Sequence, residues 1–429
     1  YMAMNESFLH YIWQFQYFDK ANLETQQGEQ VSIFKTGWLN TNAGPDFSGA
    51  KIRIGDLDWV GNVEIHQKAS DWIAHSHTQD KAYENVILHV VWEGDEVITR
   101  MDGSVIPTIE LKDRVDESLL KAYRKLITSG TVIPCEKSFQ SADELIKLSM
   151  VEKSLLKRLE YKAHEAQQVL QSNGGDWQET AYQLLARNFG FKINSESFFQ
   201  LAKSLPYKII AKHSSNLLQL EALLFGQAGM LETKTKDEYV TALFEEYLFL
   251  SKKYSIYDSR LSTAQWKFLR LRPANFPTLR IAQFASLMAS EKSLFPTFIE
   301  ADSFVKLQSV LSCSPSVYWH SHFHFARKSK TKIHSFGQAS KENVIINTIV
   351  PLWVAYGKAK DDQRYVDRAM EILQHIPAEV NKITKIWSGL GMSLQSSFDS
   401  QALIEQYNTL CQKRDCLNCV VGASLLRPQ

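Results

Sequence analysis

The chain has 429 residues, of which 44% are hydrophobic and 22% are charged, and its formal net charge is +1. This length exceeds what a single hydrophobic core usually supports, so we expect an ordinary globular protein of two or three domains. The balanced charge excludes a chain-wide attraction to nucleic acid or to an anionic membrane, and no stretch reaches the roughly 18 apolar residues of a membrane helix.

The N-terminal part is predicted to be mixed α/β. Apolar residues recur at helical spacing near its start, and alternation of apolar and polar residues then predicts strands. Short loops that contain Gly and Asp separate these runs and are typical of hairpins. In chain order, we expect a helix over residues 5–18, strands over 31–40, 47–54, 59–68 and 85–95, and a hairpin over 96–111 that turns at Asp102 and Gly103.

Helical spacing dominates after about residue 112, and Pro, Gly and Asn separate successive runs. The clearest predicted helices cover residues 116–127, 144–171, 177–190, 217–229, 241–254, 342–358 and 365–376. We therefore predict an α+β protein. Residues 1–112 would form a mixed α/β domain in the order helix, strand meander, helix, strand, and residues 113–429 a large, mostly α-helical domain with a cysteine cluster at its C-terminus.

Acidic and basic side chains gather on the first predicted hairpin. Pro45 and Asp46 open its first strand, and Glu64, His66 and Lys68 share one face of its second strand because strand side chains alternate. The hairpin brings Asp46 beside this face. Carboxylates hold Mg²⁺ or Mn²⁺, the metal activates water, and a nearby cation stabilises the anionic transition state of phosphodiester hydrolysis. We predict Asp46, Glu64, His66 and Lys68 as catalytic residues.

Histidines follow this hairpin closely. His75 and His77 form a His-x-His step, which suits a segment that presents imidazoles to a metal, and Asp80 and His89 lie nearby in the sequence. With imidazole ligands, Zn²⁺ becomes as suitable as Mg²⁺ or Mn²⁺. The predicted ligands of this divalent-metal site are Asp46, Glu64, His66, His75, His77 and Asp80.

The stretch from residue 5 to about residue 95 resembles the PD-(D/E)xK nuclease superfamily. Pro45 and Asp46 match the PD motif, and Glu64 takes the acidic position. The resemblance implies a core of helix, strand meander, helix and strand, and metal-dependent cleavage of DNA or RNA. His66 occupies the position of the superfamily's lysine, so either Lys68 substitutes for that lysine or His66 binds the metal itself.

The whole chain is also similar to a bacterial family known only as domain of unknown function 2851. The similarity is carried, in order, by NTNAGPDF, WVGNVEIHQKASDW, AHSHTQDKAY, NVILHVVWEGD, EALLFGQAG, LRLRPANFPTLRIAQ, INTIVPLWVAYG and CLNCVVG. It implies a shared fold and brings no established activity.

Three of the five cysteines lie close together near the C-terminus. Cys411, Cys416 and Cys419 form a C-x4-C-x2-C run, whose thiolates suit Zn²⁺ or an iron–sulfur cluster with Cys135 or Cys313 as a fourth ligand. The alternative is that these are reduced, buried thiols. The odd count does not resemble a secreted disulfide framework, and the N-terminus lacks signal-peptide features, so we expect a cytoplasmic protein.

A basic and aromatic stretch lies in the helical part. We predict nucleic-acid contacts for its four cations, Lys267, Arg270, Arg272 and Arg280. Its aromatic residues are Trp266, Phe268 and Phe276. Such a set can contact phosphates and stack on bases. The alternative is that these arginines are solvated at helix ends. Further along, His320, His322 and His324 alternate, which would align them on a strand face as a second metal site.

Three functions are consistent with these patterns. The first is a metal-dependent phosphodiesterase or nuclease acting on DNA or RNA, which requires the carboxylates of Asp46 and Glu64 to converge. The second is a non-catalytic nucleic-acid-binding or scaffold protein with a decayed nuclease-like domain, in which Glu64 pairs with Lys68 in solvent. The third is a zinc-dependent hydrolase of a non-nucleic substrate, in which His75 and His77 meet a third ligand and one coordination position stays open.

Overall fold

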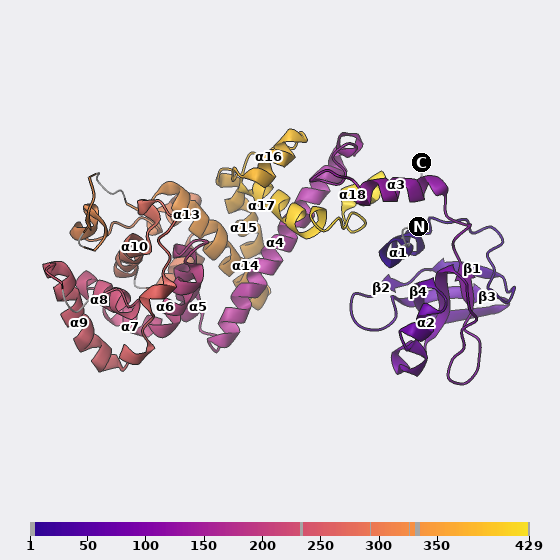
Figure 1. Ribbon diagram of the computed structural model, residues 1–429, viewed down its shortest axis with the longest axis horizontal. Helices are drawn as coiled ribbons and strands as arrows, with labels where there is room; N and C mark the ends of the chain where they lie inside the picture. Colours follow the sequence, from indigo (N-terminus) through magenta and orange to yellow (C-terminus); the bar gives the residue numbers. More distant parts are fainter. Residues whose placement is uncertain (1–4, 232–234, 292, 326, 331–334, 428–429) are drawn as a thin grey trace. The chain divides into compact units, whose positions relative to one another are not determined.

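The computed structural model describes residues 5–231, 235–291, 293–325, 327–330 and 335–427. The chain divides into two compact units (Figure 1). The first, here called the head, comprises Tyr1–Val151 and Gln406–Gln429, and the second, here called the helical unit, comprises Glu152–Glu405. Within the described residues, no helix is both long enough and apolar enough to span a membrane.

The head is larger than the domain expected over residues 1–112, because it includes a C-terminal segment and the chain that follows the sheet. The ring of Tyr123 stacks on that of Phe8 with centroids 4.2 Å apart. Arg414 donates to the carbonyl oxygen of Thr131. These contacts attach residues beyond 112 to the N-terminal helix and to the C-terminal segment.

The head is built on a six-stranded mixed sheet with the strand order β1-β3-β4-β5-β6, in which β2 also pairs with β3. The strands are β1 Val31–Lys35, β2 Trp38–Leu39, β3 Phe47–Ile54, β4 Leu57–Lys68, β5 Val86–Glu93 and β6 Thr108–Glu110. β1, β3 and β4 are antiparallel, whereas β4, β5 and β6 are parallel. This sheet and the helical unit together confirm the predicted α+β class.

The β3–β4 hairpin has the register on which the candidate site depends. Phe47 pairs with Val63, so Asp46, the residue before β3, lies opposite Glu64. The register shifts between Phe47 and Ala50, which marks a bulge near this end of the hairpin.

The second expected hairpin, over residues 96–111, is reduced to an isolated bridge between Thr99 and Val105. Its second arm becomes β6, which pairs with β5 in parallel. The two arms still face each other, because the amide of Ile106 donates to the carbonyl oxygen of Ile98 and both side chains pack in one core cluster with Trp72.

Short helices connect the strands of the head. Helix α1 (Glu6–Phe15) begins at Asn5, whose side chain accepts a hydrogen bond from the amide of Ser7. The parallel connection from β4 to β5 contains α2 (Asp71–Ala74) and two 3₁₀ turns, η1 (His77–Gln79) and η2 (Lys81–Tyr83). A short helical crossover is the usual way to connect parallel neighbours.

The head is completed by helices from both sides of the helical unit in the sequence. These are α3 (Glu117–Ile127), η3 (Phe139–Ser141), the π-helical turn η9 (Tyr407–Cys411) and α18 (Val420–Leu425). The hydroxyl of Tyr11 on α1 donates to the carbonyl oxygen of Ala423 on α18 at 3.0 Å. The C-terminal segment is therefore fixed against the first helix.

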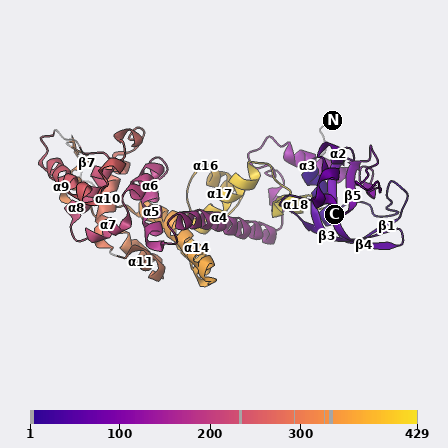
Figure 2. The same ribbon diagram turned by 90° about the horizontal axis from the view of Figure 1, so that it is seen from below.

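The helical unit follows the predicted helices closely, and Figures 1 and 2 both show α8 beside α9 and α10. Its α-helices are α4 Glu144–Ser172, which begins in the head, α5 Trp177–Phe189, α6 Ser195–Ser204, α7 Tyr207–Lys212, α8 Leu217–Gln227, α9 Glu238–Tyr254, α10 Pro277–Ser290, α11 Leu294–Glu300, α12 Phe304–Val310, α13 Gln338–Val344, α14 Val350–Lys360, α15 Arg364–His375, α16 Lys382–Gly389 and α17 Ser397–Gln406. The short strands β7 His322–His324 and β8 Arg327–Lys328 pair with each other.

Candidate metal centre

Three imidazoles converge at the end of β4. Ligand nitrogens of His66, His75 and His77 all lie within 4.8 Å of one another, and this is the one such group of three or more His, Cys, Asp or Glu side chains in the described residues. Nδ1 of His75 lies 3.2 Å from Nε2 of His66. Ligands held tetrahedrally at 2.0–2.1 Å from an ion are about 3.3 Å apart. The three nitrogens therefore fit one side of a small divalent ion.

The carboxylate of Glu64 contacts two of these imidazoles. Its Oε1 lies 3.3 Å from Nε2 of His77 and 3.5 Å from Nε2 of His66. The predicted strand alternation thus puts Glu64 and His66 on one face, together with the two histidines of the crossover. Glu64 is not one of the three residues whose ligand atoms all lie within 4.8 Å of one another, but its carboxylate borders the group closely enough to act on a ligand or water at the open side.

The backbone conformation of Ser76 allows the side chains of both neighbouring histidines, His75 and His77, to lie on the same side of the crossover. Its φ of 60° lies in the left-handed region, which a non-glycine residue seldom adopts. The indole of Trp72 donates to Oγ1 of Thr78 at 3.0 Å and so anchors the turn that follows. Backbone strain of this kind concentrates at functional sites, where the surrounding structure enforces it.

The imidazole of His66 is oriented by a second, fully buried histidine. Nδ1 of His66 lies 2.9 Å from Nε2 of His89. A free lone pair on Nε2 of His66 requires its proton on Nδ1, which then donates to His89. An outer hydrogen bond of this type fixes the tautomer of a metal-binding histidine. Tyr83 similarly stacks on His77, with ring centroids 3.8 Å apart.

Asp46 holds Glu64 and makes its own contacts elsewhere. Its backbone amide donates to Oε2 of Glu64 at 3.0 Å. Its Oδ2 accepts the amide of Ile65 at 2.9 Å and lies 3.2 Å from Nε2 of His10. The two residues are adjacent, as expected, but Asp46 is not part of the group of converging ligand atoms. The structure gives it an orienting position beside Glu64.

Burial sets the charge state of this cluster. Burial and the neighbouring charge of Asp46 raise the pKa of Glu64 to about 8. Burial, followed by the charges of His77 and His75, lowers the pKa of His66 to about 4. Burial also lowers the pKa of His77 and that of His89. Neutral imidazoles have the free lone pair that a metal ligand needs, and a bound cation would favour the ionised form of Glu64.

Two predicted residues stand apart from the converging atoms. Lys68 is exposed at the end of β4, its amide donates to Asp71 at 2.9 Å, and its charge acts on Asp95. Asp80 is also exposed and accepts the amide of Ala82 at 2.9 Å as the cap of η2. The contacts of Lys68 are therefore with Asp71 and Asp95 rather than with Glu64.

His10 is a site residue that the sequence did not suggest. It lies on α1, and its only signal was a polar residue within the aromatic run FLHYIW. Its contact with Asp46 joins the first helix to the hairpin. A helix of the head thus supports the site across a long separation in sequence.

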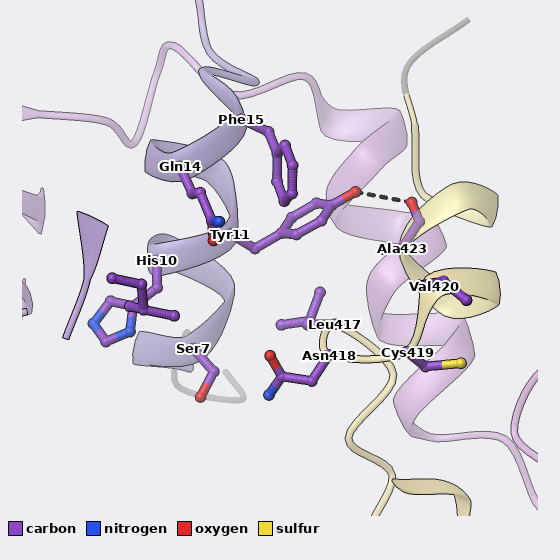
Figure 3. Close-up of a pocket in the computed structure, with 11 residues that line it drawn as sticks. Ser7, His10, Tyr11, Gln14, Phe15, Leu417, Asn418, Cys419, Val420 and Ala423 are labelled. Carbon is purple, nitrogen blue, oxygen red and sulfur yellow. Dashed lines mark hydrogen bonds between the residues drawn. The ribbon is translucent and has the colours of Figure 1, made fainter. Parts of the chain in front are cut away.

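Two cavities reach the residues of the site. One of about 250 Å³ is lined by His77, Tyr83 and Arg100 among others. The other, of about 320 Å³, lies between α1 and the segment before α18 and is lined by His10 and Tyr11 (Figure 3). The first cavity reaches His77, one of the three converging histidines, whereas the second reaches only His10, the contact of Asp46.

The predicted basic stretch of the helical unit is only partly exposed. Lys267, Arg270 and Arg272 are exposed. Arg280, in contrast, is only 5% exposed, and its guanidinium donates to Asn275 at 2.6 Å and to Gln283 at 3.0 Å. The expectation that Arg280 contacts nucleic acid is therefore corrected, because the side chain is buried and both of its terminal nitrogens donate inside the helical unit.

Comparison with known proteins identifies the family. Residues 6–382 match the model of a family described as protein of unknown function (DUF2851), so the chain belongs to that family. Neither the curated proteins nor the solved structures contain a match.

Proposed function

We propose that this member of the family is a divalent-metal-dependent hydrolase that cleaves phosphodiester bonds of nucleic acid. The observation that carries the proposal is the convergence of His66, His75 and His77 beside Glu64. Three imidazoles with an open fourth position are a usual ligand set of catalytic zinc. Mn²⁺ is the alternative that also accepts imidazole and carboxylate ligands.

The ligand set suggests a role in hydrolysis for each residue of the site. A divalent ion bound there would lower the pKa of a water and polarise a phosphoryl oxygen. Oε1 of Glu64 is positioned to accept the proton of that water, while Oε2 is held by the amide of Asp46. His89 keeps the proton of His66 on Nδ1, and His10 steadies Asp46 from α1.

The order of elements in the head supports a phosphodiester as the substrate. A helix, an antiparallel meander, a short helical crossover and a parallel strand follow one another as α1, β1 to β4, α2 and β5. This is the order that the resemblance to the PD-(D/E)xK superfamily implies. The acidic positions of that motif, Asp46 and Glu64, are brought side by side.

A surface of the sheet also suits nucleic acid. Phe34 is 52% exposed and Trp38 is 70% exposed. Lys51 and Arg53 lie over the ring of Phe34, at 5.6 Å and 5.4 Å from its centroid, and Lys35 lies 4.7 Å from that of Trp38. Exposed rings flanked by cations bind single strands by stacking and phosphate contact. Because the net charge of the chain is only +1, binding of nucleic acid requires a local basic patch, and we propose this aromatic–cationic surface for that role.

The proposal is tested with the whole chain on labelled single- and double-stranded DNA and RNA, in the presence of Mg²⁺, Mn²⁺ or Zn²⁺. The variants are Glu64→Gln, which keeps the shape of the side chain, and His77→Ala. His164→Ala, at an exposed position of α4, is the control. We expect metal-dependent cleavage that both site variants lose and the control retains.

Two outcomes would overturn the nuclease proposal. Cleavage that survives in both site variants would come from elsewhere. Binding of nucleic acid without cleavage under any metal would leave the head as a scaffold, which is the second function expected from the sequence.

A second candidate function is a zinc-dependent hydrolase of a non-nucleic substrate. It is favoured by the ligand group itself, because three histidines are more typical of hydrolytic zinc than of a magnesium nuclease. Activity on small esters or phosphomonoesters, lost in His77→Ala and absent with nucleic acid, would support it in place of the first.

A further inference from the structure

Four of the five cysteines come together in the head, although one is distant in the sequence. The thiol of Cys411 interacts electrostatically with those of Cys419, Cys135 and Cys416, and Cys416 interacts with Cys135 and Cys419. All four side chains are buried. Cys135 therefore joins the three C-terminal cysteines.

The fifth cysteine belongs to other surroundings. Cys313 is buried in the helical unit, where its thiol interacts with Arg280 and Lys341. The sequence predicted Cys135 as the fourth partner and left Cys313 as its alternative. The structure selects Cys135 and makes Cys313 a matched control, because it is equally buried.

Hydrogen-bond donors surround one sulfur of the cluster. The side-chain amide of Gln406 donates to Sγ of Cys419 at 3.1 Å and reaches Sγ of Cys411 at 3.9 Å. The backbone amides of Val421 and Gly422 also donate to Cys419. A neutral thiol is a weak acceptor, whereas a metal-bound thiolate is commonly supported by such donors. Burial raises the pKa of all four thiols, so these donors would support the thiolate of Cys419 once a bound metal displaces its proton.

A cation is also available to the cluster. Burial and the neighbouring thiols raise the pKa of Cys416, and the charge of Arg414 acts in the opposite direction. One terminal nitrogen of Arg414, Nη1, is buried and has no hydrogen-bond partner among the described residues. Four thiolates around a divalent ion carry a net negative charge, which a neighbouring guanidinium stabilises.

The backbone of the C-terminal segment is closely fitted around the sulfurs. A Cβ on Gly422 would lie 2.2 Å from the carbonyl oxygen of Cys416, so only glycine allows α18 to approach this turn. Cys411 ends a π-helical turn, a feature that is frequent at functional sites. Figure 3 shows the sulfur of Cys419 directed away from α1, although Cys419 is one of the residues that line the cavity beside His10.

We propose that Cys135, Cys411, Cys416 and Cys419 bind a thiophilic metal centre, either a zinc ion or an iron–sulfur cluster, that fastens the C-terminal segment to the rest of the head. Each ligand loses its S–H proton to solvent as its metal–sulfur bond forms. No three of these sulfurs lie within 4.8 Å of one another in the described residues. A single zinc ion would draw them to about 3.8 Å, whereas an iron–sulfur cluster accepts a wider spacing.

The experiment is a metal and sulfide analysis of the whole chain, purified without oxygen. It compares the wild type with Cys135→Ser, Cys313→Ser and, to remove metal from the histidine site, His75→Ala. We expect a sulfur-bound zinc or iron content that Cys135→Ser loses while Cys313→Ser and His75→Ala retain it, and His75→Ala loses only the metal of the histidine site. Inorganic sulfide with visible absorption assigns the cluster, and X-ray absorption with a metal–sulfur distance of about 2.3 Å assigns zinc.

The proposal is overturned if the wild type holds no thiolate-bound metal, or if Cys135→Ser retains as much as Cys313→Ser. Circular dichroism of each variant tests folding. If Cys135→Ser does not fold, chelation of the wild type replaces it: release of thiolate-bound metal with newly titratable thiols supports the proposal, and no release of such metal contradicts it. The result does not depend on the proposed hydrolase activity.

Discussion

Histidines are used in opposite ways in the two units. In the head, the rings of His66, His75 and His77 face one another and leave nitrogens converging. In the helical unit, Nδ1 of His322 lies 2.8 Å from the carbonyl oxygen of Tyr318, within reach to donate to it. His320 and His322 thus contact backbone carbonyl oxygens beside a short hairpin, whereas the nitrogens of the His-x-His step in the head converge with that of His66.

Buried carboxylates show the same contrast. In the helical unit, Glu405 pairs with Arg158 at 3.2 Å, and Glu221 accepts the hydroxyl proton of Tyr239 at 2.9 Å. In the head, Glu64 is buried beside a second acidic residue, which raises its pKa. Glu405 of the helical unit thus has a cationic partner, whereas Glu64 of the head is surrounded by an acidic residue and by histidines whose pKa is lowered.

The largest expected effect is the loss of metal from the head in His77→Ala. Removing an outer hydrogen bond to a metal ligand typically weakens binding about 10–100-fold, so removing a ligand should weaken it by more than about 100-fold. Titration calorimetry with Zn²⁺ and Mn²⁺ measures the change. His322→Ala, in the helical unit, should leave this affinity unchanged. Equal affinities in the wild type and His77→Ala would break the contrast between the two sets of histidines.

A glycine of the helical unit gives the next largest effect, on stability rather than on metal binding. A Cβ at Gly226 on α8 would lie 2.1 Å from the ring of Tyr247 on α9, so Gly226→Ala should lower the free energy of unfolding by about 2–3 kcal/mol. Denaturant unfolding followed by circular dichroism measures it. Gly389→Ala is the control, because nothing lies within 4 Å of its added Cβ. A loss of metal affinity in folded Gly226→Ala would contradict the expectation that metal binding depends on the head alone.

The pH dependence of the helical unit should reveal its buried carboxyl group. Burial raises the pKa of Glu221 to about 7 from an ordinary value of 4.5. Its contribution to stability is therefore complete below pH 4.5 and is lost as the pH rises through 7. Glu221→Gln should be more stable than the wild type at pH 8 by about 3 kcal/mol, and about equal to it at pH 4. A difference independent of pH would show that Glu221 stays ionised when buried.

The sequence predicted the site best where its geometry is local. The hairpin and strand alternation sufficed to bring Asp46 beside Glu64 and to put Glu64 and His66 on one face, because both follow from neighbouring residues. The resemblance to a family of unknown function was also correct, since that family's model covers most of the chain. Neither the strand alternation nor the family resemblance predicted which atoms of these side chains would converge.

What the sequence missed depends on long-range packing. The contact of His10 with Asp46 requires the position of α1 on the sheet, and the choice of Cys135 over Cys313 requires the return of the C-terminal segment to the head. The burial of Arg280 depends on the packing of α10 in the helical unit. Helical spacing and motif length carry no information about such distant neighbours.

The smallest expected effect concerns the aromatic–cationic surface of the sheet. Phe34→Ala should weaken binding of a labelled single strand by about 1 kcal/mol, because one stacking platform is lost while the site histidines stay intact. Fluorescence anisotropy with a metal-free sample measures binding apart from cleavage. Phe249→Ala is the matched control: this ring is also exposed, on α9, yet no lysine or arginine lies over it in the described residues. If both variants bind as the wild type does, nucleic acid does not use this surface; if Phe34→Ala alone binds more weakly, substrate contact, like metal binding, belongs to the head.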